Sequence, residues 1–246
     1  MSKEILIVKG LMKKYNQNTD YTIKDLSFVA RAGEVVGIVG RNGAGKSTTI
    51  KCITGLHPFD EGQINITGYD VVKNPIEAKY HLGYVPDVSL AFDKMTGIEY
   101  LNFIADIFDI SEEERKERIS ELDSAFGLGE ALNRLINSYS HGMKQKISVM
   151  ASILPEPDLW ILDEPLTGLD PQTSSALKKM MVDYAGKGHS VIFSSHNLDV
   201  VEKLCDRVII ISNGRLVKDM TRKEVDSLGV SLEDYFVNNT FDGDAR

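Results

Sequence analysis

The 246-residue sequence has only two cysteines, Cys52 and Cys205, which are far apart in the chain. No CxxC pair occurs, so we expect neither a disulfide framework nor a zinc site. No run approaches the roughly 20 consecutive apolar residues of a membrane span. The first residues also lack the long apolar segment of a signal peptide. We therefore expect a cytoplasmic protein with reduced, buried thiols.

Positive charge is also in short supply. The 28 lysines and arginines are outnumbered by 36 acidic residues, which gives a formal net charge of −8. A general nucleic-acid surface needs clustered basic residues, so no nucleic-acid partner is expected. The length and the 42% hydrophobic content are enough for one large domain, or for a core with a subdomain.

The segment GIVGRNGAGKSTTIKC carries three glycines between an apolar run and a sequence suited to start a helix. Gly40, Gly43 and Gly45 can adopt backbone angles that let successive N–H groups converge on an anion. The spacing from Gly40 to Lys46 and Ser47 matches the phosphate-binding loop (P-loop) at every defined position. Lys46 is expected to reach the β- and γ-phosphates of a nucleotide, and the Ser47 hydroxyl to bind Mg²⁺. The alternative is a glycine-rich turn, which the flanking strand and helix signals disfavour.

A second motif, LWILDEP, places two carboxylates directly after four apolar residues. A buried strand that ends in this way delivers its carboxylates to the crevice where α/β sheets bind ligands. Asp163 is the expected Mg²⁺ partner, and Glu164 is expected to polarise the water that attacks the γ-phosphate. The alternative is a pair of solvated turn residues.

Strands and helices follow a pattern that changes along the chain. Short strands separated by turn signals dominate the start, apolar residues at helical spacing fill the middle third, and strands and helices then alternate. Such alternation predicts a mostly parallel sheet covered by helices. The expected strands are 5–8, 27–30, 35–39, 63–67, 159–162, 190–195 and 207–212, followed by a last turn at 212–217. The expected helices are 96–108, 111–126, one capped by Ser140 and stopped before Pro155, and two that begin at Pro171 and Asn197.

Taken in order, the motifs resemble those of the ATP-binding cassette (ABC) ATPases over nearly the whole chain. SYSHGMKQK stands just upstream of LWILDEP, where the family has its signature motif, and LTGLD matches the D-loop. His196, after two serines, occupies the position of the switch histidine. P-loops are widespread, whereas this ordered set is specific to the family.

The resemblance implies an α/β fold: a P-loop NTPase core with a mostly parallel sheet, an N-terminal antiparallel β part and an inserted α-helical subdomain. It implies one ABC ATPase domain, with the core at 1–87 and 158–246 and the helical subdomain at 88–157. The implied cofactors are ATP and Mg²⁺. The implied catalytic residues are Glu164, His196 and Lys46, the metal ligands Ser47, Asp163 and Asp87, and the nucleotide-binding residues Tyr15, Gly40, Asn42, Gly43, Ala44, Gly45, Lys46, Ser47, Thr48, Ser140, Gly142 and Asp170.

Several of these roles belong to a dimer. In the family, Ser140 and Gly142 would bind the γ-phosphate of ATP held by a second cassette, so that two nucleotides are sandwiched between two head-to-tail chains. A helix N-terminus can bind phosphate in this way, although Ser140 can also serve only as a helix cap. His196 would contact the γ-phosphate and Tyr15 would stack on adenine, and packing is the alternative role for Tyr15.

Two positions depart from the family pattern. The signature has His141 before Gly142 where a glycine is usual, and Met143 follows where glutamine is common. Asp87 occupies the Q-loop position, which usually holds glutamine. A carboxylate binds Mg²⁺, often through water, but it cannot donate a hydrogen bond.

The resemblance further implies separate transmembrane permease subunits that hold the cassette at the inner face of the cell membrane. Residues 85–108 resemble cassettes of export systems, and the stretch from Gly214 to Arg246 is too short for the regulatory barrel of many sugar importers. One alternative is a non-transport ABC ATPase acting on nucleic acid or the ribosome. The short spacing between Lys46 and Asp163 disfavours it. A regulatory, binding-only cassette is the other alternative, which His141 keeps open.

Overall fold

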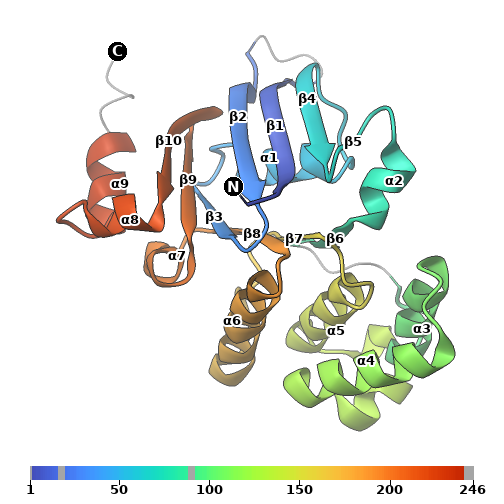
Figure 1. The fold of residues 1–246 in the computed structure, drawn as a ribbon. Helices are drawn as coiled ribbons and strands as arrows, with labels where there is room; N and C mark the ends of the chain where they lie inside the picture. Colours follow the sequence, from blue (N-terminus) through green and yellow to red (C-terminus); the bar gives the residue numbers. More distant parts are fainter. Residues whose placement is uncertain (1, 16–19, 88–91, 241–246) are drawn as a thin grey trace.

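The computed structural model describes residues 2–15, 20–87 and 92–240, and it contains two β-sheets (Figure 1). The smaller sheet has the strand order β2-β1-β4-β5, and its pairs are antiparallel. Its strands are β1 (Glu4–Lys13), β2 (Ile23–Arg31), β4 (Glu61–Ile66) and β5 (Tyr69–Asp70). The expected N-terminal antiparallel part is therefore confirmed.

The larger sheet has the strand order β10-β9-β3-β8-β7-β6. Its strands from β9 to β6 are parallel, and β10 pairs antiparallel with β9 at one edge. The strands are β3 (Val35–Val39), β6 (Leu82–Val85), β7 (Leu159–Leu162), β8 (Ser190–Ser195), β9 (Arg207–Ser212) and β10 (Arg215–Thr221). This mixed sheet confirms the predicted α/β class.

The larger sheet separates two hydrophobic cores, which explains why its strands read as continuous apolar runs. On β3, Val36 and Ile38 pack into the core shared with α1 (Lys46–Ile53) and the smaller sheet. Val35 and Val39 point to the opposite core, which lies under α5 (His141–Ile153), α6 (Pro171–Gly186) and α7 (Leu198–Leu204). All five residues of β3 are buried.

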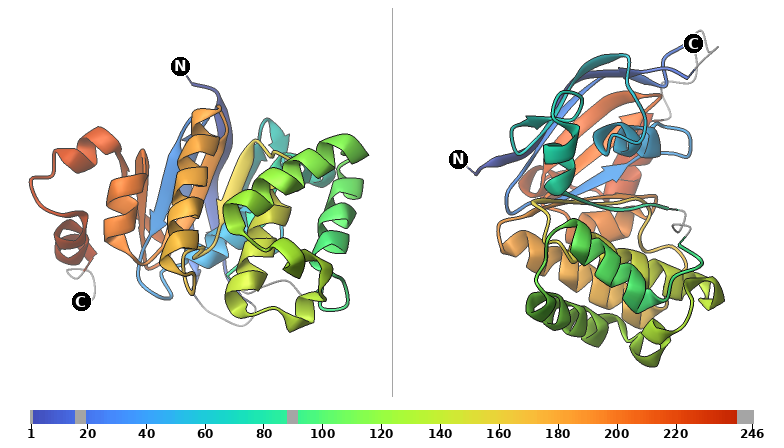
Figure 2. Two further views of the ribbon diagram at one scale, coloured as in Figure 1. Left: turned by 90° about the horizontal axis from the view of Figure 1, so that it is seen from below. Right: turned by 90° about the vertical axis from the view of Figure 1, so that its right-hand side faces the viewer.

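The helices of the middle third form a group of their own beside the β6 and β7 end of the larger sheet (Figures 1 and 2). This group contains α3 (Gly97–Ile107), α4 (Glu112–Phe126), the 3₁₀ turns η1 (Gly129–Asn133) and η2 (Ile136–Ser138), and α5. The remaining helices are α2 (Pro75–Tyr80), α8 (Arg222–Asp226) and α9 (Leu232–Thr240).

Local capping explains where the predicted helices begin. The Ser140 hydroxyl accepts a hydrogen bond from the Met143 N–H at 3.3 Å, which confirms the predicted cap of α5. Thr96 and Glu99 form a capping box at the start of α3. Asn197 caps α7 through Val200 N–H. These polar side chains satisfy N–H groups that have no partner within the helix.

Strand β1 and the expected last turn both differ from the sequence-based expectation. Strand β1 continues to Lys13. Its pairing with β2 shifts in register around Gly10, which has φ 58°, and resumes beyond it. The expected last turn is a hairpin, since Asn213 and Gly214 both have positive φ and lead into β10. Of the segment 85–108 assigned to export systems, residues 88–91 lie outside the described residues.

Candidate functional site

The P-loop connects β3 to α1. Gly45 caps α1 with φ 109°, a conformation that side-chain-bearing residues rarely adopt. A Cβ on Gly40 would lie 2.4 Å from the Ile211 carbonyl oxygen, so this position needs glycine for close backbone approach. The Lys46 ammonium folds into the loop and donates to the carbonyl oxygens of Gly40 at 2.8 Å and Arg41 at 3.3 Å.

The other P-loop residues surround this lysine. Asn42 and Gly43 are exposed, whereas Ala44 is buried. The Ala44 carbonyl accepts a hydrogen bond from Gly214 N–H at 3.0 Å, so the hairpin between β9 and β10 supports the loop. The Thr48 hydroxyl lies 3.2 Å from that of Tyr15. The loop thus exposes its first residues, while its second half is anchored to the protein.

A buried carboxylate joins the P-loop to the end of β7. Asp163 is 1% exposed, and its Oδ1 accepts hydrogen bonds from the hydroxyls of Ser47 at 3.2 Å and Ser194 at 2.6 Å. No described residue donates to Oδ2. A hydroxyl and a carboxylate that converge in this way supply the oxygen ligands that Mg²⁺ prefers, so the predicted metal ligands Ser47 and Asp163 fit the ion.

Ser194 was not among the residues expected from sequence. The parallel register pairs Leu162 with Phe193, which sets the next residues, Asp163 and Ser194, side by side at the ends of β7 and β8. Both follow an apolar run, and this shared pattern is the signal that could have identified Ser194.

Glu164 and His196 form a pair at the carboxyl ends of β7 and β8. Glu164 has φ 48°, and its N–H donates to Ser194 Oγ at 2.9 Å. Its Oε2 lies 2.9 Å from Nδ1 of His196. An ionised carboxylate only accepts hydrogen bonds, so Nδ1 carries the proton when Glu164 is charged. Ser194 therefore holds the Asp163 carboxylate and the Glu164 backbone, and His196 holds the Glu164 carboxylate.

Asp87 follows β6 on the other side of β7. Strand β6 reaches the site because the Val85 carbonyl accepts the Asp163 N–H at 2.9 Å. Burial, followed by the charges of Asp163 and Asp87, raises the pKa of the Tyr84 hydroxyl. Asp87 thus acts on the same phenol as Asp163. It makes no hydrogen bond to another described residue.

Tyr15 lies beside the start of α1. Its ring packs edge-on against His57 with the centroids 5.8 Å apart, and the Lys13 ammonium lies 5.4 Å from its centroid. The ring is 37% exposed. It therefore retains surface on which a flat ring could stack.

The signature residues lie away from this chain's own P-loop. Ser140 and Gly142 stand at the exposed start of α5, and neither is hydrogen-bonded to a described P-loop residue. The His141 ring packs on the D-loop, since a Cβ on Gly168 would lie 2.8 Å from the ring. Asp170 caps α6 and accepts from Thr173 N–H and hydroxyl at 2.9 and 2.6 Å, bonds that lower the pKa of its carboxyl.

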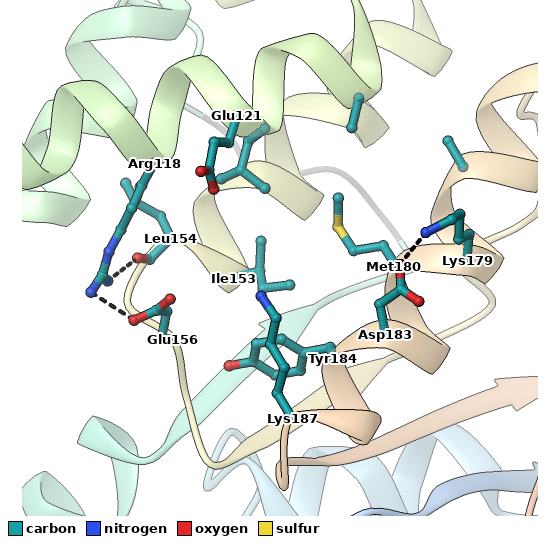
Figure 3. A pocket seen from close by; sticks show the side chains of 13 residues that line it. Arg118, Glu121, Ile153, Leu154, Glu156, Lys179, Met180, Asp183, Tyr184 and Lys187 are labelled. Carbon is teal, nitrogen blue, oxygen red and sulfur yellow. Dashed lines mark hydrogen bonds and ion pairs between the residues drawn. The ribbon is translucent and has the colours of Figure 1, made fainter.

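A cleft of about 350 Å³ lies between α4, the end of α5 and α6 (Figure 3). None of the predicted site residues lines it. Arg118 crosses one side and donates to the Leu154 carbonyl at 2.7 Å, with Glu156 also 2.7 Å away. Tyr184 donates to the Pro157 carbonyl at 2.6 Å. We interpret the cleft as the joint between the helical group and the core.

The described part of the chain shows neither a clustered metal site nor a membrane-spanning helix. Within it, no three His, Cys, Asp or Glu side chains are grouped so that they could hold a metal ion. None of the helices found there combines the length and apolar character needed to cross a bilayer.

Known proteins are similar to this chain in sequence and in fold. A family model described as "ABC transporter" matches residues 23–167. The linearmycin resistance ATP-binding protein LnrL of Bacillus subtilis is 35% identical over 90% of this chain and 70% of its own length. The daunorubicin/doxorubicin resistance ATP-binding protein DrrA of Streptomyces peucetius is 35% identical over 89% of this chain and 66% of its own.

One solved structure, titled as the ATP-binding subunit of an ABC transporter, superposes with a TM-score of 0.90. It is 35% identical to this chain and covers 96% of it, and the match spans 99% of the solved chain.

Proposed function

The chain belongs to the ABC transporter family, and on that basis we propose that it is the ATP-hydrolysing subunit of a membrane exporter. The observation that carries the ATPase assignment is the junction of the P-loop with Asp163 and Glu164 through Ser47 and Ser194. The names of the relatives LnrL and DrrA, both resistance proteins, support export over import.

ATP binding follows from the P-loop geometry. Its backbone N–H groups and the Lys46 ammonium would hold the phosphates, and Tyr15 would stack on the adenine. Ser47 and Asp163 would hold Mg²⁺, and Asp87 would reach the ion through water. The ion, when held there, would supply positive charge to the phosphates during transfer.

Hydrolysis would depend on Glu164. A water oxygen attacks the γ-phosphorus, the bond to the bridging oxygen breaks, and ADP leaves with the electron pair. Glu164 accepts the proton of the attacking water, a role that suits a carboxylate held by the His196 imidazole on a backbone held by the Ser194 hydroxyl. His196 keeps the Glu164 carboxylate in place and lies near the γ-phosphate.

The active unit would be a dimer of cassettes. Ser140 is exposed and Gly142 half-buried at the start of α5, and neither is hydrogen-bonded to a described residue of its own P-loop. They would bind the γ-phosphate held by a second cassette, with Asp170 of the D-loop between the two. Binding of ATP closes the dimer and hydrolysis reopens it, which shifts the permease between its states.

We further assign residues 1–87 and 158–246 to the catalytic core and 88–157 to the helical subdomain. Separate transmembrane permease subunits would hold the cassette at the inner face of the cell membrane.

The test is purification of the tagged protein from its native cells in mild detergent, with mass spectrometry of its partners. We expect a multi-span membrane protein in stoichiometric amount, and ATP hydrolysis that changes when it is present. Stoichiometric recovery of ribosomal or DNA-bound proteins instead would contradict the exporter assignment and favour a non-transport ATPase.

A further inference from the structure

A pocket of about 280 Å³ lies against the Glu164 and His196 pair. The D-loop and α6 form one side of it, with Thr167, Ser174 and Lys178, and Asn197 lines it before α7. No P-loop residue lines the pocket. The pocket is therefore separate from the P-loop.

Lys178 is the cation of this pocket. Its side chain is half-buried, yet it forms no ion pair or hydrogen bond with any described residue. The next residue, Lys179, faces the cleft of Figure 3 and pairs with Asp183 one turn along α6. Adjacent lysines on one helix thus differ in that only one already has a carboxylate partner.

Hydroxyl groups accompany the ammonium. Ser174 is four residues before Lys178, so both lie on the same face of α6. Neither the Ser174 nor the Thr167 hydroxyl is hydrogen-bonded to a described residue. An ammonium and two hydroxyls without partners form a set of donors suited to a small oxyanion.

The one acidic group in the pocket is Glu164. Because Glu164 is the proposed hydrolytic site, the pocket adjoins the place where phosphate would be produced.

We propose that this pocket receives the inorganic phosphate released by hydrolysis and holds it between Lys178, Ser174 and Thr167, while ADP stays in the P-loop. The inference rests on the proposed function, since it needs Glu164 to be the hydrolytic site. Thr167, His196 and Asn197 are exposed in the single chain, so the bound phosphate can leave to solvent once the dimer has reopened.

The first test uses calorimetry to measure the equilibrium binding of inorganic phosphate to protein saturated with Mg-ADP. The variant is Lys178→Gln, and the matched control is Lys179→Gln. A charged hydrogen bond is lost only in the first, so we expect phosphate affinity to fall about 10-fold or more for Lys178→Gln and to stay unchanged for Lys179→Gln. Lys178→Arg should retain phosphate affinity.

The second test is inhibition of steady-state ATP hydrolysis by added phosphate. The inhibition constant should rise about 10-fold in Lys178→Gln, with the affinity for ATP within about two-fold of wild type because Lys178 does not line the P-loop. Equal effects of the two glutamine variants, or wild-type phosphate affinity in Lys178→Gln, would overturn the proposal. A wild-type protein that binds phosphate beside ADP but does not hydrolyse ATP would instead refute the proposed function.

Discussion

At the scale of single residues, one hydroxyl organises the site. Ser194 Oγ donates to Asp163 Oδ1 at 2.6 Å and accepts the Glu164 N–H at 2.9 Å. The serine thus fixes the proposed metal ligand and the proposed general base with one group. Glu164 is held in a left-handed conformation, φ 48°, by the same contact.

Ser194→Ala removes both hydrogen bonds from a buried place. We expect the free energy of unfolding to fall by about 1–3 kcal/mol, because Asp163 and the Glu164 N–H lose their partner. The rate of ATP hydrolysis should fall by about 10-fold, since each 1.4 kcal/mol corresponds to a factor of ten. Urea titration and a phosphate-release assay measure the two effects.

The control lies on the same strand. Ser190 is equally buried, but its hydroxyl has no hydrogen-bond partner. Ser190→Ala should therefore change the free energy of unfolding by less than about 0.5 kcal/mol or increase it. Similar losses in the two variants would show that the Ser194 hydroxyl has no special role.

Glu164→Gln keeps the size of the side chain and removes the base. We expect ATP hydrolysis to fall by about 100-fold or more with the affinity for ATP retained. Single-turnover hydrolysis and equilibrium nucleotide binding measure these quantities. Glu113→Gln, on the first turn of α4, is the control and should behave as wild type. A Glu164→Gln protein that turns over normally would remove Glu164 from the mechanism.

Residue type and spacing were enough to name the P-loop lysine, Ser47, Asp163 and Glu164 from the sequence. Each of these residues belongs to a short local motif, either a loop or the residues just after a strand. The same type of pattern precedes Ser194, but its role depends on the register of β7 and β8, which brings Ser194 to Glu164, 30 residues away in the sequence. The roles of Tyr15 and His196 toward a nucleotide stay predictions.

The thiols were also predicted from the sequence to be buried. Both cysteines are free and buried, and burial raises the pKa of Cys52 to about 11 and raises that of Cys205. Because the thiolate is the reactive form, neither should react quickly with thiol reagents in the native state.

At the scale of elements, the joint between the helical group and the core depends on one arginine of α4. Arg118 reaches the Leu154 carbonyl after α5, and it forms ion pairs with Glu114 and Glu156. Its side chain is only 21% exposed. These contacts bind α4 to the loop that leads from α5 into β7.

Arg118→Ala should lower the free energy of unfolding by about 1–3 kcal/mol, because a partly buried carbonyl and a carboxylate lose a charged donor. Lys116→Ala, on the same helix, removes an i,i+4 pair with Glu112 in which both side chains are more than 70% exposed. Its effect should be below about 0.5 kcal/mol. Chemical denaturation compares the two, and equal losses would contradict the assigned role of Arg118.

Ser140 combines a cap with a proposed contact to the second cassette. Ser140→Ala should cost about 1 kcal/mol of stability, as should Ser111→Ala at the cap of α4. Ser140→Asp can keep the cap, since aspartate also accepts the Met143 N–H, but its charge would repel a γ-phosphate.

Only the two Ser140 variants should impair ATP-dependent dimerisation, as measured by light scattering. Dimers that form normally in Ser140→Asp would leave Ser140 with the cap alone.

The elements that carry strong local signals were predicted well, and weak ones were not. Helix α4 begins one residue after the expected start at 111, and α5 begins directly after its predicted cap, Ser140. Strand β10 was missed because its sequence, RLVKDMT, is mostly polar and exposed, and only pairing with β9 makes it a strand. Helices α8 and α9 were missed too, since both are short and depend on packing against α7 and β10.

At the scale of the molecule, the candidate functional side chains lie at the carboxyl ends of the strands of the larger sheet. The P-loop follows β3, Asp163 and Glu164 follow β7, and His196 follows β8. These three strands are parallel, so the residues lie together at the carboxyl ends of the strands. The signature residues lie in the separate helical group (Figure 1). The signature residues and the P-loop therefore stand apart within one copy, and the completion of one site by two copies stays a prediction from the family resemblance.

The central claim is that ATP bound by one copy is completed by Ser140 of a second. Sedimentation equilibrium of the Glu164→Gln protein with Mg-ATP tests it most directly, with ADP and the added Ser140→Asp change as controls. The account predicts that the mass doubles from 27.3 kDa with ATP only and that Ser140→Asp abolishes the increase. A protein that binds ATP yet stays a monomer at every concentration would contradict it.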